Sequence, residues 1–167
     1  MQNIIFIHGL ESSGNGFKGR LLQKWLPSCL TPDFEKFNSK ISLKKLLEIR
    51  MEKLYSILNK KTPWIIIGSS FGGLMATIYT YQNREKISKL VLLAPYLSNH
   101  NLNPKVYSKV DIPVIIYHGK RDKIVPLNYS RIYAESIFTN LKYNIVDDDH
   151  SLHNTVLTLD WNNLIKI

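Results

Sequence analysis

Apolar residues along the chain follow two alternating patterns, which predict a sheet of parallel strands covered by helices. Short unbroken apolar runs, such as residues 4–7 and 64–67, are typical of strands buried on both faces. Between such runs apolar residues recur at helical spacing, most clearly over residues 42–58. We expect strands at residues 3–7, 29–34, 64–68, 89–93, 113–117 and 142–146. We expect helices at residues 17–26, 42–58, 71–83, 128–139 and 154–165, and a loop with at most one short helix at residues 96–111.

The order of these segments predicts the α/β class. Because nearly every connection between strands carries a helix, the sheet of about six strands should be mostly parallel, with helices on both faces. The length of 167 residues fits a single domain spanning residues 1–167, and 44% apolar residues suffice for a real core.

Composition narrows the cellular compartment in which we expect the protein and the kinds of cysteine site that it can contain. No apolar run approaches the length of a membrane span, and the first residues read as a core strand rather than a signal peptide. Cys29 is the only cysteine, which excludes an internal disulfide and a thiolate metal cluster. We expect Cys29 to be a buried structural thiol and the protein to be cytoplasmic.

The net charge of +9 favours anionic partners in principle. The basic residues are scattered, however, and their densest stretch, residues 40–61, coincides with the clearest amphipathic helix. A solvated lysine-rich surface is therefore the better interpretation, and we expect no specific nucleic-acid partner.

The first candidate catalytic residue lies at the end of the strand predicted at residues 64–68. The sequence Gly68-Ser69-Ser70-Phe71-Gly72 fits G-x-S-x-G, in which a serine stands at the tip of a tight strand-to-helix turn. Such a turn exposes the serine hydroxyl above the sheet, and small flanking residues let strand and helix approach closely. Ser70 is therefore the candidate nucleophile.

A base and an acid follow the ends of later strands. In open α/β sheets reactive groups gather at the carboxyl ends of strands, where Asp122 and His150 stand. His150 would take the proton of Ser70, and Asp122 would fix the tautomer of the imidazole. Asp111 is a rival acid but precedes its strand, and His153 is a rival base three residues beyond His150.

Two backbone N–H groups are expected to form an oxyanion hole, those of Phe71, directly after the nucleophile, and of Leu10, after the first strand. We expect His8 and His118 to be structural and to bond the backbone. Residues 147–149 should form a solvated acidic turn rather than a metal site. The candidate residues of the substrate pocket are Glu11, Tyr96, Val125 and Leu152.

With these motifs in place, the chain resembles the α/β-hydrolase superfamily, and in particular the small bacterial YqiA-like esterases. The resemblance rests on residues 7–13 with Phe17-Lys18 behind them, on the elbow at residues 68–73, and on residues 149–152. It implies carboxylic-ester hydrolysis by Ser70, Asp122 and His150. The chain lacks the two extra first strands of the larger fold and the lipase-type His-Gly-Gly-Gly, and its short loop after Leu93 leaves little or no lid.

The sequence thus predicts a serine esterase that cleaves small or short-chain acyl esters through an acyl-enzyme, without metal or organic cofactor. A thioesterase or a small peptidase would use the same three residues. A non-catalytic binding protein on the same fold is the alternative from another class. The expected partner is a small-molecule ester, and a homodimer is compatible with the sequence.

Overall fold

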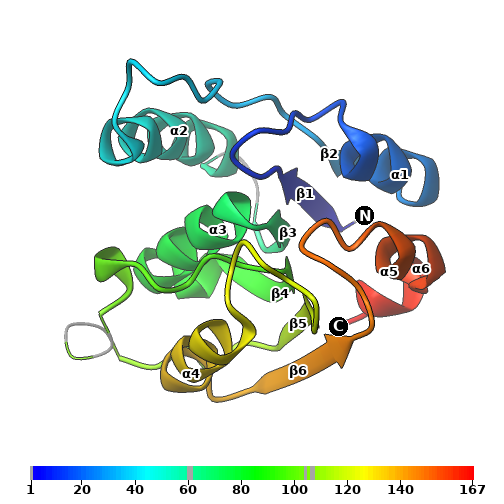
Figure 1. Ribbon diagram of the computed structural model, residues 1–167. Helices are drawn as coiled ribbons and strands as arrows, with labels where there is room; N and C mark the ends of the chain where they lie inside the picture. Colours follow the sequence, from blue (N-terminus) through cyan, green and yellow to red (C-terminus); the bar gives the residue numbers. More distant parts are fainter. Residues whose placement is uncertain (1, 60–61, 104, 106–107) are drawn as a thin grey trace.

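The computed structural model describes residues 2–59, 62–103, 105 and 108–167, and these form a six-stranded parallel sheet (Figure 1). Lys60, Lys61 and positions 104, 106 and 107 of the predicted loop lie outside the described residues. The strands are β1 (Asn3–Ile7), β2 (Cys29–Leu30), β3 (Trp64–Ser69), β4 (Ile87–Leu93), β5 (Val114–Gly119) and β6 (Leu141–Val146). The predicted fold class is confirmed, although the second strand is much shorter than expected.

Helices connect the strands in the expected alternation. The α-helices are α1 (Phe17–Trp25), α2 (Leu43–Leu58), α3 (Phe71–Gln82), α4 (Leu127–Ile137), α5 (His153–Thr158) and α6 (Trp161–Leu164). Two short 3-10 helices, η1 (Arg84–Lys86) and η2 (His100–Leu102), flank β4. The side chain of Ser42 caps α2 by accepting from the Lys45 amide, which explains why the helix begins where the apolar periodicity begins.

The strand order is β2-β1-β3-β4-β5-β6, with every neighbouring pair parallel. The chain starts in β1, moves outward to β2, and then returns to the other side of β1 to lay down the remaining strands. The connections that follow β1 and β3 therefore leave the sheet in opposite directions. Ligands of open parallel sheets bind at such a switch point, beyond the carboxyl ends of the strands.

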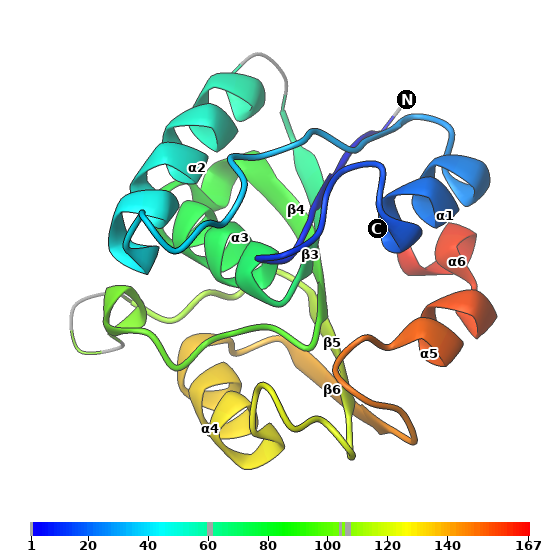
Figure 2. The same ribbon diagram turned by 45° about the horizontal axis from the view of Figure 1, so that its top comes forward.

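Two hydrophobic layers cover the sheet, as expected for strands buried on both faces. Ile5 and Ile7 of β1 belong to the layer formed with α2, α3 and α4, whereas Ile4 and Phe6 belong to the layer formed with α1, α5 and α6. Figure 2 shows these two groups of helices on opposite faces of the sheet. Helix α3 is buried along almost its whole length, because α2 packs over it from outside. The strand ends that α3 joins are consequently held firmly in place.

Two helix predictions need correction. The last helix is two helices, because Asp160 interrupts the predicted run at residues 154–165 and its side chain accepts from the Asn163 amide to start α6. In α1, helical spacing predicts Phe17, Leu21, Leu22 and Trp25 on one buried side. The inward residues are instead Gly19 and Leu22, while Phe17 and Trp25 are 37% and 48% exposed. Gly19 lies directly on the backbone of Gly14, a close approach that turns the aromatic residues outward.

Cys29 is buried in the layer beside α1, and burial raises the pKa of its thiol to about 12. This confirms a structural thiol. Among the described residues, no helix combines the length and the apolar character that a membrane crossing requires.

Candidate active site

Ser70 occupies a strained turn between β3 and α3. Its φ of 52° and ψ of −114° are a backbone conformation that a residue with a side chain rarely adopts. Gly72 makes the turn possible, because a Cβ at this position would lie 2.1 Å from the Ile7 carbonyl oxygen. The glycine therefore lets the start of α3 pass directly over the end of β1, and Ser70 is raised above the sheet.

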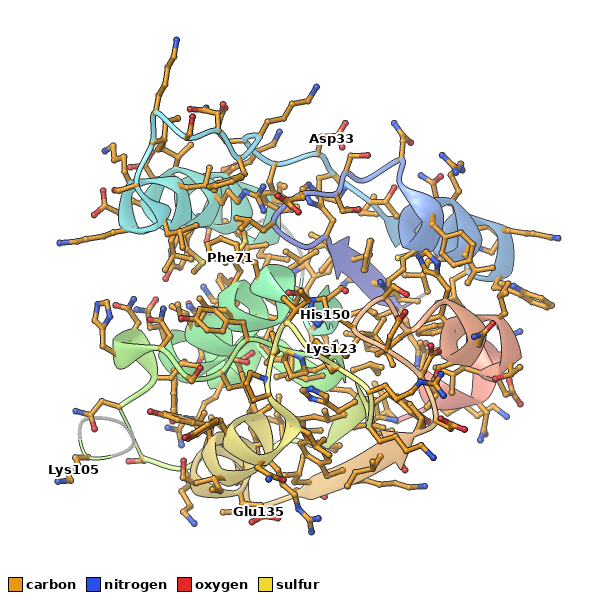
Figure 3. The ribbon with its side chains drawn as sticks, in the orientation of Figure 1. Asp33, Phe71, Lys105, Lys123, Glu135 and His150 are labelled. Atoms are coloured by element: carbon orange, nitrogen blue, oxygen red, sulfur yellow. The ribbon has the colours of Figure 1, made fainter. Side chains whose placement is uncertain are left out.

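The structure brings together the three side chains predicted to act as nucleophile, base and acid. His150 Nε2 lies 3.0 Å from Ser70 Oγ, and His150 Nδ1 lies 2.7 Å from Asp122 Oδ2. The Asp122 side chain is fully buried, whereas the His150 side chain is 23% exposed. In Figure 3 His150 reaches the middle of the molecule from the loop after β6, close to the start of α3. The side chain of His150 thus joins the two others at the switch point.

Asp122 is held by N–H groups on both of its oxygens. The amides of Ile124 and Val125 donate to Oδ1 at 2.8 and 2.9 Å. His150 Nδ1 and His118 Nε2 approach Oδ2 at 2.7 and 3.1 Å. A carboxylate offers about four acceptor positions, so these contacts satisfy the buried charge and fix its orientation.

His118 extends this network beneath Asp122. Its Nε2 faces two acceptors, the Val125 carbonyl oxygen at 3.0 Å and Asp122 Oδ2, so the ring proton must reside on this nitrogen. Its Nδ1 then accepts from the Tyr143 hydroxyl at 2.9 Å. Burial lowers the pKa of His118, which keeps the ring neutral, and burial raises the pKa of Tyr143 to about 12. The expected backbone bond of His118 is present, but its contact with Asp122 was not foreseen.

The loop that carries His150 is anchored by Asp148, which corrects the prediction of a solvated acidic turn. Asp148 is 3% exposed, and its Oδ2 accepts from the amide and the hydroxyl of Thr155 at 2.9 and 2.8 Å. Burial alone would raise the pKa of Asp148, but the hydrogen bonds from Thr155 and Asp149 outweigh it and lower the pKa below its usual value. Asp147 forms an exposed ion pair with Arg121. Among the described residues, no group of His, Cys, Asp and Glu could hold a metal ion.

The loop after β1 lies against the nucleophile. A Cβ on Gly9 would stand 3.5 Å from the Cβ of Ser70, so this backbone passes beside the serine at van der Waals distance. The ring of His8 is buried under the loop: Nδ1 donates to the Gly9 carbonyl oxygen at 2.8 Å, and Nε2 accepts from the Phe34 amide at 3.0 Å. Leu10 thus lies on one side of Ser70 and Phe71, the first residue of α3, on the other.

A cleft of about 380 Å³ opens over Ser70, between the loop after β1 and the segments that carry Ile124 and His150. Glu11 lines it as predicted, but Tyr96, Val125 and Leu152 do not. The side chain of Leu152 is fully buried in the layer beside α5, Val125 is 6% exposed, and Tyr96 packs against the opposite layer. The lining residues are Phe6, Gly9, Leu10, Glu11, Ser12, Lys18, Ser69, Ser70, Ile124, His150, Ser151 and His153.

The cleft residues that were not predicted include Lys18, Ile124 and His153. Lys18 projects from α1 beside the nucleophile, and burial lowers the pKa of its ammonium group although Asp149 and Asp148 act in the opposite direction. His153, weighed above only as a rival base, packs against Phe17 with ring centroids 4.2 Å apart and the rings tilted by 42°. Ile124 and His153 follow the predicted site residues Asp122 and His150 by a few positions, and Lys18 lies in the first turn of the helix after the first strand. Their place in the topology alone could have indicated them.

A parallel sheet with a strained serine after β3, an acid after β5 and a histidine after β6 defines an α/β hydrolase. Comparison with known proteins agrees. Residues 22–159 match the model of the phospholipase/carboxylesterase family, and the chain belongs to this family.

Individual relatives are distant. The chain is 25% identical to acyl-protein thioesterase 1 homolog 2 of Dictyostelium discoideum, over 80% of this chain and 75% of that protein. Among solved structures, the mouse alpha/beta hydrolase domain-containing protein 10 superposes with a TM-score of 0.72 at 20% identity, covering 94% of this chain and 87% of that one. Est1E from Butyrivibrio proteoclasticus, solved with ferulic acid bound, gives 0.72 at 18% identity, covering 93% and 86%. The two structures show a shared fold.

Proposed function

We propose that the protein is a serine esterase that cleaves small carboxylic esters through an acyl-enzyme. The observation that carries the proposal is the continuous set of hydrogen bonds from Ser70 Oγ through His150 to the buried Asp122. A serine hydroxyl is a weak nucleophile until an adjacent base takes its proton, and this arrangement supplies the base and its orienting acid.

In the acylation step, Ser70 Oγ attacks the ester carbonyl carbon while its proton passes to His150 Nε2. The carbonyl electron pair moves onto oxygen, where the amides of Leu10 and Phe71 are proposed to stabilise the negative charge. The charge on Asp122 stabilises the imidazolium that forms. When the carbonyl re-forms, the bond to the leaving oxygen breaks and that oxygen takes the proton from His150.

Deacylation repeats the sequence with water. A water molecule gives its proton to His150 Nε2 as its oxygen bonds to the acyl carbon, and a second tetrahedral oxyanion forms at the same place. Its collapse breaks the bond to Ser70 Oγ, and the proton on His150 returns to this oxygen. The acid leaves, and the free enzyme is restored without another reactant.

The size of the cleft supports short acyl groups. A volume of about 380 Å³ is near the lower end of small-molecule sites. Its apolar wall consists of few side chains, chiefly Phe6, Leu10 and Ile124, and polar groups line the rest. Two open hollows adjoin the cleft, and the residues that they add are mainly charged or polar: Ser13, Gly16, Lys36 and Phe37 on one side, and Arg121, Lys123 and Asp149 on the other. A long acyl chain would therefore find little apolar surface to cover it.

A thioester is the second candidate substrate. The curated relative from Dictyostelium discoideum is named an acyl-protein thioesterase, and the same serine, histidine and aspartate would serve that reaction. A thiolate leaves more readily than an alkoxide, so a thioester would acylate Ser70 by the same steps as an oxygen ester. A peptidase would use the same groups against a poorer leaving group.

A matched panel of acetyl and butyryl oxygen esters, thioesters and anilides, extended by a decanoyl oxygen ester, separates these candidates, with Ser70→Ala as the blank. We expect turnover of the oxygen esters, a fall in kcat/KM from butyryl to decanoyl esters, and no turnover above the blank for anilides. Faster turnover of thioesters than of matched oxygen esters would favour the second candidate. The absence of any turnover above Ser70→Ala would leave the non-catalytic binding protein as the better account.

A further inference from the structure

Arg50 has a buried guanidinium group beneath the active site, on the inner face of α2. Its side chain is fully buried, and it stands between Leu46 and Leu54 on a helix face that is otherwise apolar. The partners of the guanidinium are backbone carbonyl groups. Burial lowers the pKa of Arg50 to about 10, although Glu35 raises it in part, so the group stays charged at neutral pH.

The guanidinium binds the loop that follows β1. Nη1 donates to the Gly9 carbonyl oxygen at 3.2 Å and Nη2 to the Leu10 carbonyl oxygen at 2.9 Å. Nε donates to the Glu35 carbonyl oxygen at 2.8 Å, which ties the same side chain to the segment leading into α2. A rigid planar fork is well suited to hold several carbonyl groups in a fixed relation.

The bond to Gly9 acts directly on a proposed oxyanion donor. The Gly9 carbonyl and the Leu10 N–H belong to one peptide group, which is planar, so in the trans form they point in opposite directions. Fixing this carbonyl toward Arg50 and His8, which donates to it at 2.8 Å, therefore fixes where the Leu10 N–H points. The bond to the Leu10 carbonyl constrains the next peptide group in the same way.

Arg50 also contacts the residue that supplies the second donor. Its guanidinium carbon lies 5.5 Å from the centre of the Phe71 ring, within the range of a cation–π contact. One side chain thus reaches both sides of Ser70, the loop after β1 and the first residue of α3. A buried cation costs stability compared with an apolar residue of similar size, so stability alone does not explain its presence on this helix face.

We infer that Arg50 is a positioning residue that preorganises the oxyanion hole by fixing the Gly9–Leu10 peptide group beside Phe71. The inference rests on the proposed function. An oxyanion hole stabilises charge that appears only in the transition state, so a misdirected donor lowers kcat and leaves KM almost unchanged.

The test compares Arg50→Met with Lys89→Met, using a short-chain oxygen ester. Lys89 is a matched control, because its buried ammonium also binds backbone carbonyls, those of Leu164 and Lys166 at the other end of the sheet. We expect kcat of Arg50→Met to fall by about 10²-fold with KM within about threefold, as for the loss of one oxyanion donor. Lys89→Met should keep the kcat of the wild type.

Chemical rescue makes the test specific for the guanidinium. In Arg50→Ala, millimolar guanidinium chloride should restore part of kcat, whereas the same concentration of sodium chloride should not. If Arg50→Met does not fold, Arg50→Lys takes its place in the comparison with Lys89→Met, because lysine keeps the charge but lacks the planar fork. Wild-type kcat in a folded Arg50 variant, or equal losses in Arg50→Met and Lys89→Met, would overturn the inference.

A measurement without turnover separates this inference from the proposed function. NMR order parameters of the Leu10 and Phe71 amides should be near 0.85 in the wild type, the value of a rigid backbone, and should fall at Leu10 in Arg50→Met. An unchanged order parameter and chemical shift at Leu10 would contradict the role of Arg50 even if no ester were turned over. Conversely, loss of order at Leu10 in a protein that cleaves no ester would contradict only the proposed function.

Discussion

The two sides of the cleft are built on different principles. On the acid–base side, defined here as Asp122, His118, His150 and Tyr143, the functional groups are side chains held by one another and by the amides of a short turn. On the oxyanion side, defined as residues 8–10 with Arg50, the proposed functional group is a backbone amide. A side chain with a chemical role is visible in the sequence as a residue type, whereas an oriented peptide group is not. The second kind of site is found only through the residues that fix the peptide.

The largest expected effect comes from a substitution that disrupts the acid–base side alone. Asp122→Asn should lower kcat by about 10⁴-fold, because an amide stabilises neither the required tautomer nor the imidazolium of His150. Steady-state kinetics on a short-chain ester measures it. Asp147→Asn, which removes only exposed ion pairs with Arg121 and Lys120, serves as the control and should keep wild-type kcat. A kcat of Asp122→Asn within tenfold of the wild type would contradict the assigned acid.

The next effect concerns the contact between the oxyanion side and α3. In Gly72→Ala the new Cβ would lie 2.1 Å from the Ile7 carbonyl oxygen and 2.7 Å from that of His8, so backbone must move. We expect a loss of about 3 kcal/mol or more in the free energy of unfolding, measured by urea denaturation. Gly9→Ala is the matched variant: its nearest contacts at 3.5 Å are ordinary, and its stability should stay within about 1 kcal/mol of the wild type. Equal losses in the two variants would contradict this packing.

A smaller effect tests the anchor of the His150 loop. Asp148→Ala leaves the amide and the hydroxyl of Thr155 without their acceptor and should cost about 2 kcal/mol of stability. The exposed Asp111→Ala should cost almost nothing, as thermal unfolding of both variants will show. Since the pKa of Asp148 is lowered in the fold, its contribution is present above the unfolded pKa and disappears as pH falls through the folded pKa. At pH 7 the full loss is therefore expected, and stability equal to that of Asp111→Ala would show that the loop does not depend on Asp148.

The smallest effect is a pH dependence that both sides share. Burial lowers the pKa of His8 and of His118, so below about pH 6.5 the unfolded chain binds more protons than the fold and stability decreases. Each such histidine contributes a slope of at most about 1.4 kcal/mol per pH unit. Urea midpoints at pH 7.0 and 5.5 should therefore differ less in His118→Gln than in the wild type, while the exposed His153→Gln should match the wild type. Identical pH slopes in all three proteins would show that His118 is not held neutral.

The parts of this account that were predictable from sequence share one property. Ser70 and Asp122 each follow a strand that an unbroken apolar run indicates, and His150 follows the last predicted strand, so topology brings all three to one edge of the sheet. The sites missed depend on contacts far apart in the chain. Arg50 lies within the basic stretch of residues 40–61, which was interpreted as a solvated lysine-rich surface, although its spacing from Leu46 and Leu54 places it on the buried face. Leu152 and Val125 follow strand ends as well, but the chain turns their side chains inward, which no periodicity of so short a loop reveals.

The most direct test of the central claim, that Ser70 is an activated nucleophile, is covalent labelling by a fluorophosphonate followed by mass spectrometry of the peptides. We predict a single phosphonyl adduct on Ser70 of the folded wild type, absent after denaturation and in Ser70→Ala, and strongly slowed in Asp122→Asn. An unlabelled wild type, or an adduct on another serine that persists in Ser70→Ala, would contradict the account.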